Sequence, residues 1–106
     1  RIVKDGAIEN VYRLQIMNAT EQPQQYRVGV QGLPGIGLGV LPELNLAPAE
    51  ARWVTVSVRV PPEAARKAGS GAHPIHFEIS LRDNDARGHV TSGSGITEKS
   101  TFVVPR

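Results

Sequence analysis

The 106 residues of this sequence include no cysteine. This absence excludes disulfides, thiolate zinc sites, iron–sulfur ligation and cysteine nucleophiles from the chemistry of the chain itself. It does not decide the compartment, because reducing and oxidising environments both tolerate a cysteine-free domain. Candidate ligands and catalytic groups therefore have to be sought among histidines, carboxylates and hydroxyls.

The sequence also lacks a strong charge of one sign and long apolar runs. Twelve Lys and Arg residues against ten Asp and Glu residues give a net charge of +2, and the longest basic run is Arg66-Lys67. So diffuse a distribution is not typical of a nucleic-acid-binding protein, despite a pI of about 9.4. No apolar run reaches the roughly 18 residues of a membrane span or has the h-region of a signal peptide. Because the chain opens at Arg1 without a methionine, we expect it to be a piece of a longer protein.

What the sequence does contain is apolar residues at every second position. In residues 51–60, four valines alternate with polar side chains. The same alternation recurs in 12–17, 26–31 and 75–82. A fifth long candidate covers 97–104, and shorter apolar stretches occur at 36–40 and 44–46. One apolar face per segment is the pattern of half-buried antiparallel strands.

Eleven glycines and eight prolines separate these segments. The turn signals include Gly32-Leu33-Pro34-Gly35, Asp83-Asn84-Asp85 and Ser92-Gly93-Ser94-Gly95. Residues 61–69 alone look helical, with prolines at the start, an acid in the first turn, bases in the last turn and a closing glycine. The sequence therefore predicts an all-β, immunoglobulin-like antiparallel sandwich of about seven strands with one short helical crossover, as a single domain over 1–106. The predicted core is Leu14, Ile16, Val28, Val30, Val56, Val58, Phe77, Ile79 and Phe102.

Two glycine- or aspartate-rich segments resemble ligand-binding loops only superficially. The segment 32–39, GLPGIGLG, has Val40 where a dinucleotide fingerprint needs glycine, and it lacks the Lys-Ser/Thr pair of a phosphate-binding loop. Residues 83–88 have part of the calcium-loop spacing, but Arg87 occupies a ligand position and Ser94 stands where a bidentate carboxylate is required. We predict a turn leading into an edge strand for the first segment and a hairpin turn for the second.

The histidines are the remaining candidates for metal binding. His73 and His76 are three residues apart in a predicted strand, so their side chains should point to opposite faces of the sheet. His89 lies in a predicted loop, and no Ser-His-Asp or paired-carboxylate arrangement can be argued from spacing. We therefore predict no catalytic, cofactor-binding or metal-binding residue in this chain, and no enzymatic activity of its own.

The sequence resembles the carboxy-terminal immunoglobulin-like domain of the FixG family, also called CcoG- or RdxA-type cytochrome c oxidase accessory proteins. The residues that carry this resemblance are Gly6-Ala7-Ile8-Glu9-Asn10-Val11-Tyr12, Asn18, Tyr26-Arg27-Val28 and Gly32-Leu33-Pro34-Gly35, with 54–60 and 74–79 fitting the same pattern. We interpret four of the matching residues as turn and strand-end residues, namely Asn10, Asn18, Gly32 and Gly35.

The resemblance implies a parent protein in the bacterial inner membrane, with this domain on the periplasmic side. It also implies 4Fe-4S clusters in the parent, a role in assembly of cbb-type cytochrome c oxidase with copper handling, and a protein partner in that assembly. The cysteines that would ligate the clusters are not in this chain.

Two functions follow as hypotheses. The first is a non-catalytic interaction or scaffolding domain. Its candidate surface is Leu33, Pro34, Ile36, Leu38 and Trp53, because these apolar residues lie in a glycine-rich loop or on the polar face of a strand. For Trp53, packing of the indole on its own loops is the alternative.

The second hypothesis is a small copper- or ligand-binding module. The only soft or borderline metal ligands of such a module would be His73, His76, His89 and Met17. A carbohydrate-binding sandwich is disfavoured, because four of the five aromatic residues fall on faces assigned to the core.

Overall fold

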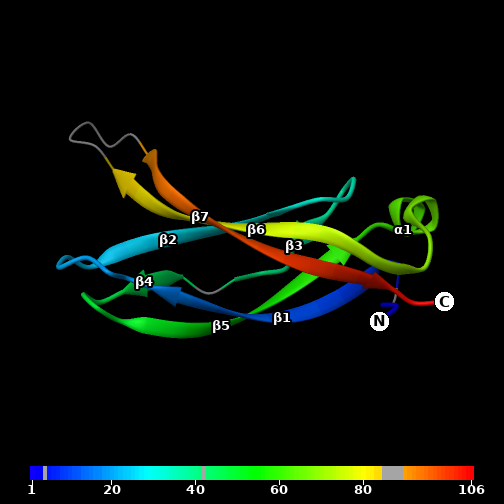
Figure 1. Cartoon of the computed structure of the whole chain (residues 1–106), viewed down its shortest axis with the longest axis horizontal. Helices are drawn as coiled ribbons and strands as arrows, with labels where there is room; N and C mark the ends of the chain where they lie inside the picture. The colour runs from blue at the N-terminus through cyan, green and yellow to red at the C-terminus, as the bar shows by residue number, and fades with distance from the viewer. Residues whose placement is uncertain (4, 42, 85–89) are drawn as a thin grey trace.

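The computed structural model describes residues 1–3, 5–41, 43–84 and 90–106, with side chains described outside 82–95. Two antiparallel sheets pack face to face (Figure 1). The three-stranded sheet has the order β1 (Ile8–Met17), β5 (Ala51–Val60), β3 (Gly37–Leu38). The four-stranded sheet has the order β4 (Leu44–Leu46), β2 (Gln24–Gln31), β6 (Gly71–Asn84), β7 (Val90–Val104). The predicted all-β immunoglobulin-like sandwich is confirmed.

The two-residue period explains how the sheets meet. In β5 all four valines, from Val54 to Val60, are buried, and the intervening side chains point outward. From the other sheet, Phe77 of β6 and Phe102 of β7 are fully buried. Of the nine predicted core residues, seven are buried; Leu14 and Val30 are half-buried and pack against that core.

The helix α1 (Pro62–Ala68) carries the chain from β5 in one sheet to β6 in the other, as predicted. Prolines begin it, Ala65 packs into the core, and Gly69 ends it with a φ of 84°. Figure 1 shows α1 at the same end of the molecule as both chain termini. Across the part of the chain that the structure describes, no helix has the length and hydropathy needed to cross a bilayer.

The prediction of a turn at Ser92-Gly93-Ser94-Gly95 is wrong. These residues belong to β7, where Gly95 pairs with Ser80 and Ser92 pairs with Arg82. A register shift lies between Ser80 and Arg82, and glycines suit such an irregularity because they have no side chain to place. The predicted turn residues Asp83 and Asn84 likewise belong to β6. The rest of the calcium-like segment, with Arg87, falls outside the described residues, and so does His89.

Candidate interaction surfaces

The predicted surface residues fall in two separate places. Leu33 and Pro34 lie in the turn between β2 and β3, beside Pro61 at the end of β5. Trp53 lies near the start of β5, eight positions earlier, which is about 25 Å along an extended strand. The structure does not bring these residues together, so each region is described by itself.

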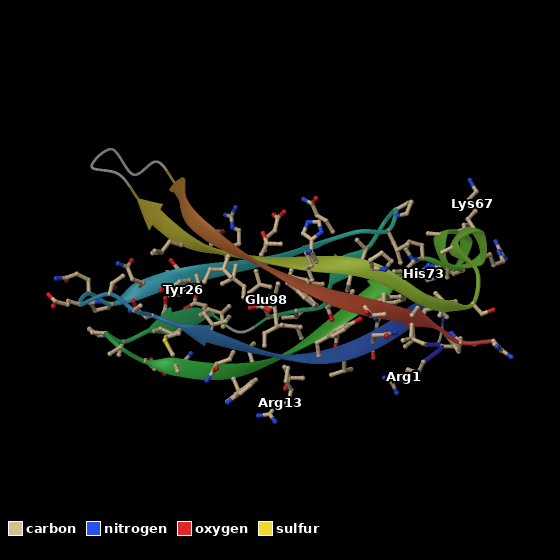
Figure 2. All side chains as sticks on the ribbon, in the orientation of Figure 1. Arg1, Arg13, Tyr26, Lys67, His73 and Glu98 are labelled. Atoms are coloured by element: carbon tan, nitrogen blue, oxygen red, sulfur yellow. The ribbon has the colours of Figure 1, made fainter. Side chains whose placement is uncertain are left out.

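The first region is a groove of about 540 Å³ between the β2–β3 turn and α1. Leu33, Pro34 and Gly35 form one wall, with Pro61 beside them. The other wall is α1, which contributes Glu63, Ala64, Lys67 and Ala68. Figure 2 shows Lys67 extending away from the helix, so its charge lies at the rim. The walls are otherwise mainly apolar.

Two glycines let the turn approach its neighbours closely. Gly35 has a φ of 71°, and a Cβ there would lie 2.8 Å from Cγ of Pro61. Gly32 has a φ of 141°, and a Cβ there would lie 2.8 Å from the carbonyl oxygen of Pro74. Both positions therefore need glycine for conformation and for space. This explains the Gly-Leu-Pro-Gly sequence as the support of one wall of the groove.

Of the four predicted loop residues, only Pro34 is exposed. Leu33, Ile36 and Leu38 are half-buried because they pack against the core, and Leu38 pairs with Val58 in β3. The loop is therefore less exposed than its composition suggests. No ligand-binding role for the glycine-rich segment follows from its geometry, which is a turn followed by the two-residue edge strand β3, as predicted.

The second region is the outward face of the three-stranded sheet around Trp53. The indole is 57% exposed, which confirms that it is accessible. The Cζ atom of Arg13, on the neighbouring strand β1, lies 5.1 Å from the ring centroid. This is the geometry of a cation–π contact.

A charged cluster on the same sheet face was not predicted from the sequence. Glu9, at an outward position of β1, is only 7% exposed because two arginines cover it. Arg59 donates from Nε to Oε2 at 3.0 Å, and Arg1 donates from Nη2 to Oε1 at 3.0 Å. The hydrogen bond from Arg59, followed by that from Arg1, lowers the pKa of Glu9 from its ordinary value of 4.5. Only the β1–β5 register, which places Arg59 opposite Glu9, could have indicated this pair.

The residues that carry the family resemblance have structural roles. Asn10 lies inside β1 rather than at a strand end, and it makes two hydrogen bonds with the backbone of Val103 in β7, at 3.1 and 3.0 Å. Tyr12 donates its hydroxyl to the carbonyl of Thr101 at 2.8 Å and packs edge-on against Phe77. The two side chains join the edge of one sheet to the edge of the other.

Asn18, at the end of β1, is fully buried. Its Nδ2 donates to the carbonyls of Gln22, Leu46 and Ala47 at 2.8 to 3.2 Å. Its Oδ1 accepts from Thr20 and from the hydroxyl of Tyr26. The interpretation of Asn18 as a strand-end residue is confirmed, and the bonds show why a buried amide is required there.

The two described histidines have different partners. The ring of His73 is 2.7 Å from the carbonyl oxygen of Gly69, near α1 (Figure 2). His76 has the opposite parity in β6 and lies 3.4 Å from a carboxylate oxygen of Glu78. Among the residues that the structure describes, no three His, Asp or Glu side chains are grouped as a metal site would require.

Comparison with known proteins places these observations in a family. Residues 1–105 match the family model described as "IG-like fold at C-terminal of FixG, putative oxidoreductase". A crystal structure of a FixG-related protein from Vibrio parahaemolyticus matches with 26% identity and a TM-score of 0.68, over 92% of this chain and 80% of that one. No curated protein matches the chain.

Proposed function

The chain belongs to the FixG C-terminal family of immunoglobulin-like domains, and from this premise we propose that it is a non-catalytic interaction or scaffolding domain. Its parent is a membrane-bound iron–sulfur accessory protein, and the domain lies on the periplasmic side. There it supports the assembly of cbb-type cytochrome c oxidase, including copper handling, by binding a protein partner.

The observation that carries this proposal is the open apolar groove between the β2–β3 turn and α1. Both walls are packed against the rest of the domain, because Gly35 lies close to Pro61 and Ala65 of the helix is buried in the core. A preformed apolar cleft with a few charges at its rim suits the burial of a partner's apolar side chains, since association then orders little of the domain.

The chain itself does not fit an iron–sulfur cluster. Such clusters are held by cysteine thiolates, with histidine as the occasional substitute, and this sequence has no cysteine. The oxidoreductase chemistry in the family description therefore belongs, in this proposal, to other segments of the parent. What this domain supplies is a binding surface.

The test uses the full-length parent protein. Deleting the domain should impair oxidase assembly while the electron paramagnetic resonance signal of the clusters stays intact. Within the domain, Pro34→Glu should reproduce the assembly defect, because it places a charge in the apolar wall of the groove. The matched control is Arg27→Glu, an exposed position on the outer face of β2.

Normal oxidase assembly after deletion would overturn the proposal. Loss of the cluster signal would instead assign the domain a structural role in the redox part. A parent sequence without membrane helices or cysteine motifs would remove its basis.

A further inference from the structure

Three exposed apolar side chains lie on the outward face of the three-stranded sheet, separated by polar ones. Val11 and Met17 of β1 and Trp53 of β5 are 59%, 58% and 57% exposed. All three occupy outward positions of adjacent strands, and Arg13 lies between them on β1. We call the surface formed by Val11, Arg13, Gln15, Met17, Trp53 and Thr55 the Trp53 face. Trp53 lies opposite Gln15, with Arg13 and Met17 as its diagonal neighbours on β1, so the surface mixes apolar and polar side chains around one arginine.

The charge on this side of the molecule is positive. The outward positions of β1 and β5 hold Arg13, Arg59 and one acid, Glu9. Glu9 is already bound by Arg59 and Arg1, so it does not neutralise Arg13. Within the described part of the chain, Arg13 forms no ion pair, and Figure 2 shows its side chain projecting from the sheet. An unneutralised arginine is therefore presented among apolar side chains.

The contact with Trp53 orients Arg13 for binding an anion. The indole holds the guanidinium at 5.1 Å while leaving its N–H donors available, and a guanidinium binds carboxylates through two parallel hydrogen bonds. The same contact covers a face of the indole that a sugar ring would need for stacking. Tryptophan and arginine are also the residue types that contribute most to protein–protein binding energy. A carboxylate of a protein is the ligand that this pair suits best.

We propose that the Trp53 face binds an acidic surface of a protein partner. A carboxylate of the partner binds Arg13, and its apolar side chains cover Val11 and Trp53. The cluster of Arg1, Glu9 and Arg59 lies four residues away along β1, about 13 Å from Arg13, and gives the partner a second positive point on the same face. This inference rests on the proposed function as an interaction domain, and it names the partner's chemistry and a surface other than the groove.

The experiment places a photo-crosslinking residue at Thr55, which is exposed and lies opposite Arg13. Full-length proteins with the same residue at Pro34, in the groove, and at Arg27, on the outer face of β2, serve as comparisons. After irradiation in cells, the adducts are purified and the crosslinked peptides are sequenced. We expect the Thr55 adduct to contain an Asp- or Glu-rich peptide of another protein, and to form more than the Arg27 adduct.

Variants of Arg13 test the role of charge. Arg13→Glu should reduce the Thr55 adduct by about tenfold or more, Arg13→Lys should retain part of it, and reversing the partner's acidic residues to lysine should restore it in Arg13→Glu. Trp53→Ala should also reduce it. Thermal unfolding of each variant checks that these exposed substitutions leave the fold intact.

Several results would overturn the inference. These are an adduct with phospholipid, an adduct with a second copy of this chain, a crosslinked peptide without acidic residues, and a yield insensitive to Arg13→Glu. If the probe at Pro34 forms an adduct with a partner and the probe at Thr55 forms none, the inference is overturned and the proposed function stands. If neither Thr55 nor Pro34 forms an adduct, the result contradicts this inference and the proposed function alike.

Discussion

Asn18 connects several separate segments of the chain through its side chain. It joins the end of β1, the β1–β2 turn and the end of β4 through one buried and two partly buried hydrogen bonds. Asn18→Ala would leave three carbonyls and the hydroxyl of Tyr26 without this partner. We expect a loss of about 3 kcal/mol in the free energy of unfolding, because each unsatisfied buried group costs roughly 1–3 kcal/mol. Urea denaturation monitored by circular dichroism measures this change.

The matched control is Asn45→Ala. Asn45 is exposed, and the amide of its side chain donates a hydrogen bond to the carboxylate of Glu43. This variant should stay within about 0.5 kcal/mol of the wild type. Equal effects of the two substitutions would contradict the structural role given to Asn18.

Glu9 makes the free energy of unfolding depend on pH in the acidic range. Its pKa is lowered in the folded state by Arg59 and then by Arg1, so its stabilising effect is present above the ordinary pKa of 4.5 and is lost as the pH falls through the lower folded value. Glu9→Gln should therefore be less stable than the wild type near neutral pH, and the difference should shrink toward zero in acid. Urea titrations at a series of pH values measure it.

The control removes Arg59, which contributes most to the lowered pKa of Glu9. In Arg59→Gln, Glu9 keeps only Arg1, so its folded pKa is lowered less, and the acid-dependent loss of stability should be smaller than in the wild type and complete at a higher pH. An unchanged pH profile in both variants would show that the cluster is not formed in solution.

The positions of the histidines allow the copper-binding hypothesis to be tested. Because His73 bonds to the backbone near α1 and His76 points to the other face of β6, the two should not chelate one ion. Isothermal titration calorimetry with Cu(I) and Cu(II) should find no sub-micromolar, stoichiometric site. Such a site, if abolished by His76→Ala, would contradict this prediction and favour a copper-binding module.

At the scale of elements, side-chain hydrogen bonds connect the two sheet edges formed by β1 and β7. Asn10 and Tyr12 are the side chains whose hydrogen bonds join these edges. Asn10→Ala should reduce stability by about 1 kcal/mol, because the bonds that it removes are exposed rather than buried. Hydrogen exchange should show faster exchange at the amide of Val103, which donates to Asn10.

Gln15→Ala is the control, since Gln15 is an exposed residue on the outward face of the same strand. It should leave the exchange rate of Val103 unchanged. Equal acceleration in the two variants would mean that β1 frays as a whole and that Asn10 has no particular role.

At the scale of the whole molecule, the two sheets share one core. Val56 and Val58 from one sheet and Phe77 and Phe102 from the other are all fully buried, so neither sheet can keep its apolar face covered alone. We expect a single cooperative unfolding transition. The fluorescence of Trp53, in the three-stranded sheet, and far-UV circular dichroism of both sheets should give the same urea midpoint.

A second transition would contradict a single domain over 1–106. Phe77→Ala tests this from the other sheet. It should lower the urea midpoint of the fluorescence and circular dichroism signals together, with a loss of about 3–5 kcal/mol in the free energy of unfolding. Thr101→Ala, at an exposed position of β7, is the control that should move neither.

The sequence alone determined the strands of the core, the helix and the accessible position of Trp53. These are local properties: alternation of apolar residues selects the buried face of a strand, and prolines and glycines begin and end short elements. The same reasoning failed at Ser92–Gly95, where small residues typical of turns lie in a long strand because the pairing with β6 outweighs their local preference.

Only the tertiary structure decided which residues meet. The pairing of Glu9 with Arg59, the contact of Arg13 with Trp53 and the bonds from Asn10 to Val103 all depend on strand register or on the packing of two sheets. The groove beside α1 likewise needs the β2–β3 turn and the helix to lie together, although 26 or more residues separate Gly35 from Pro61 and α1. The alternation of apolar residues decides which face of a strand is buried, but which strand it pairs with, and how the two sheets pack, depends on the core as a whole.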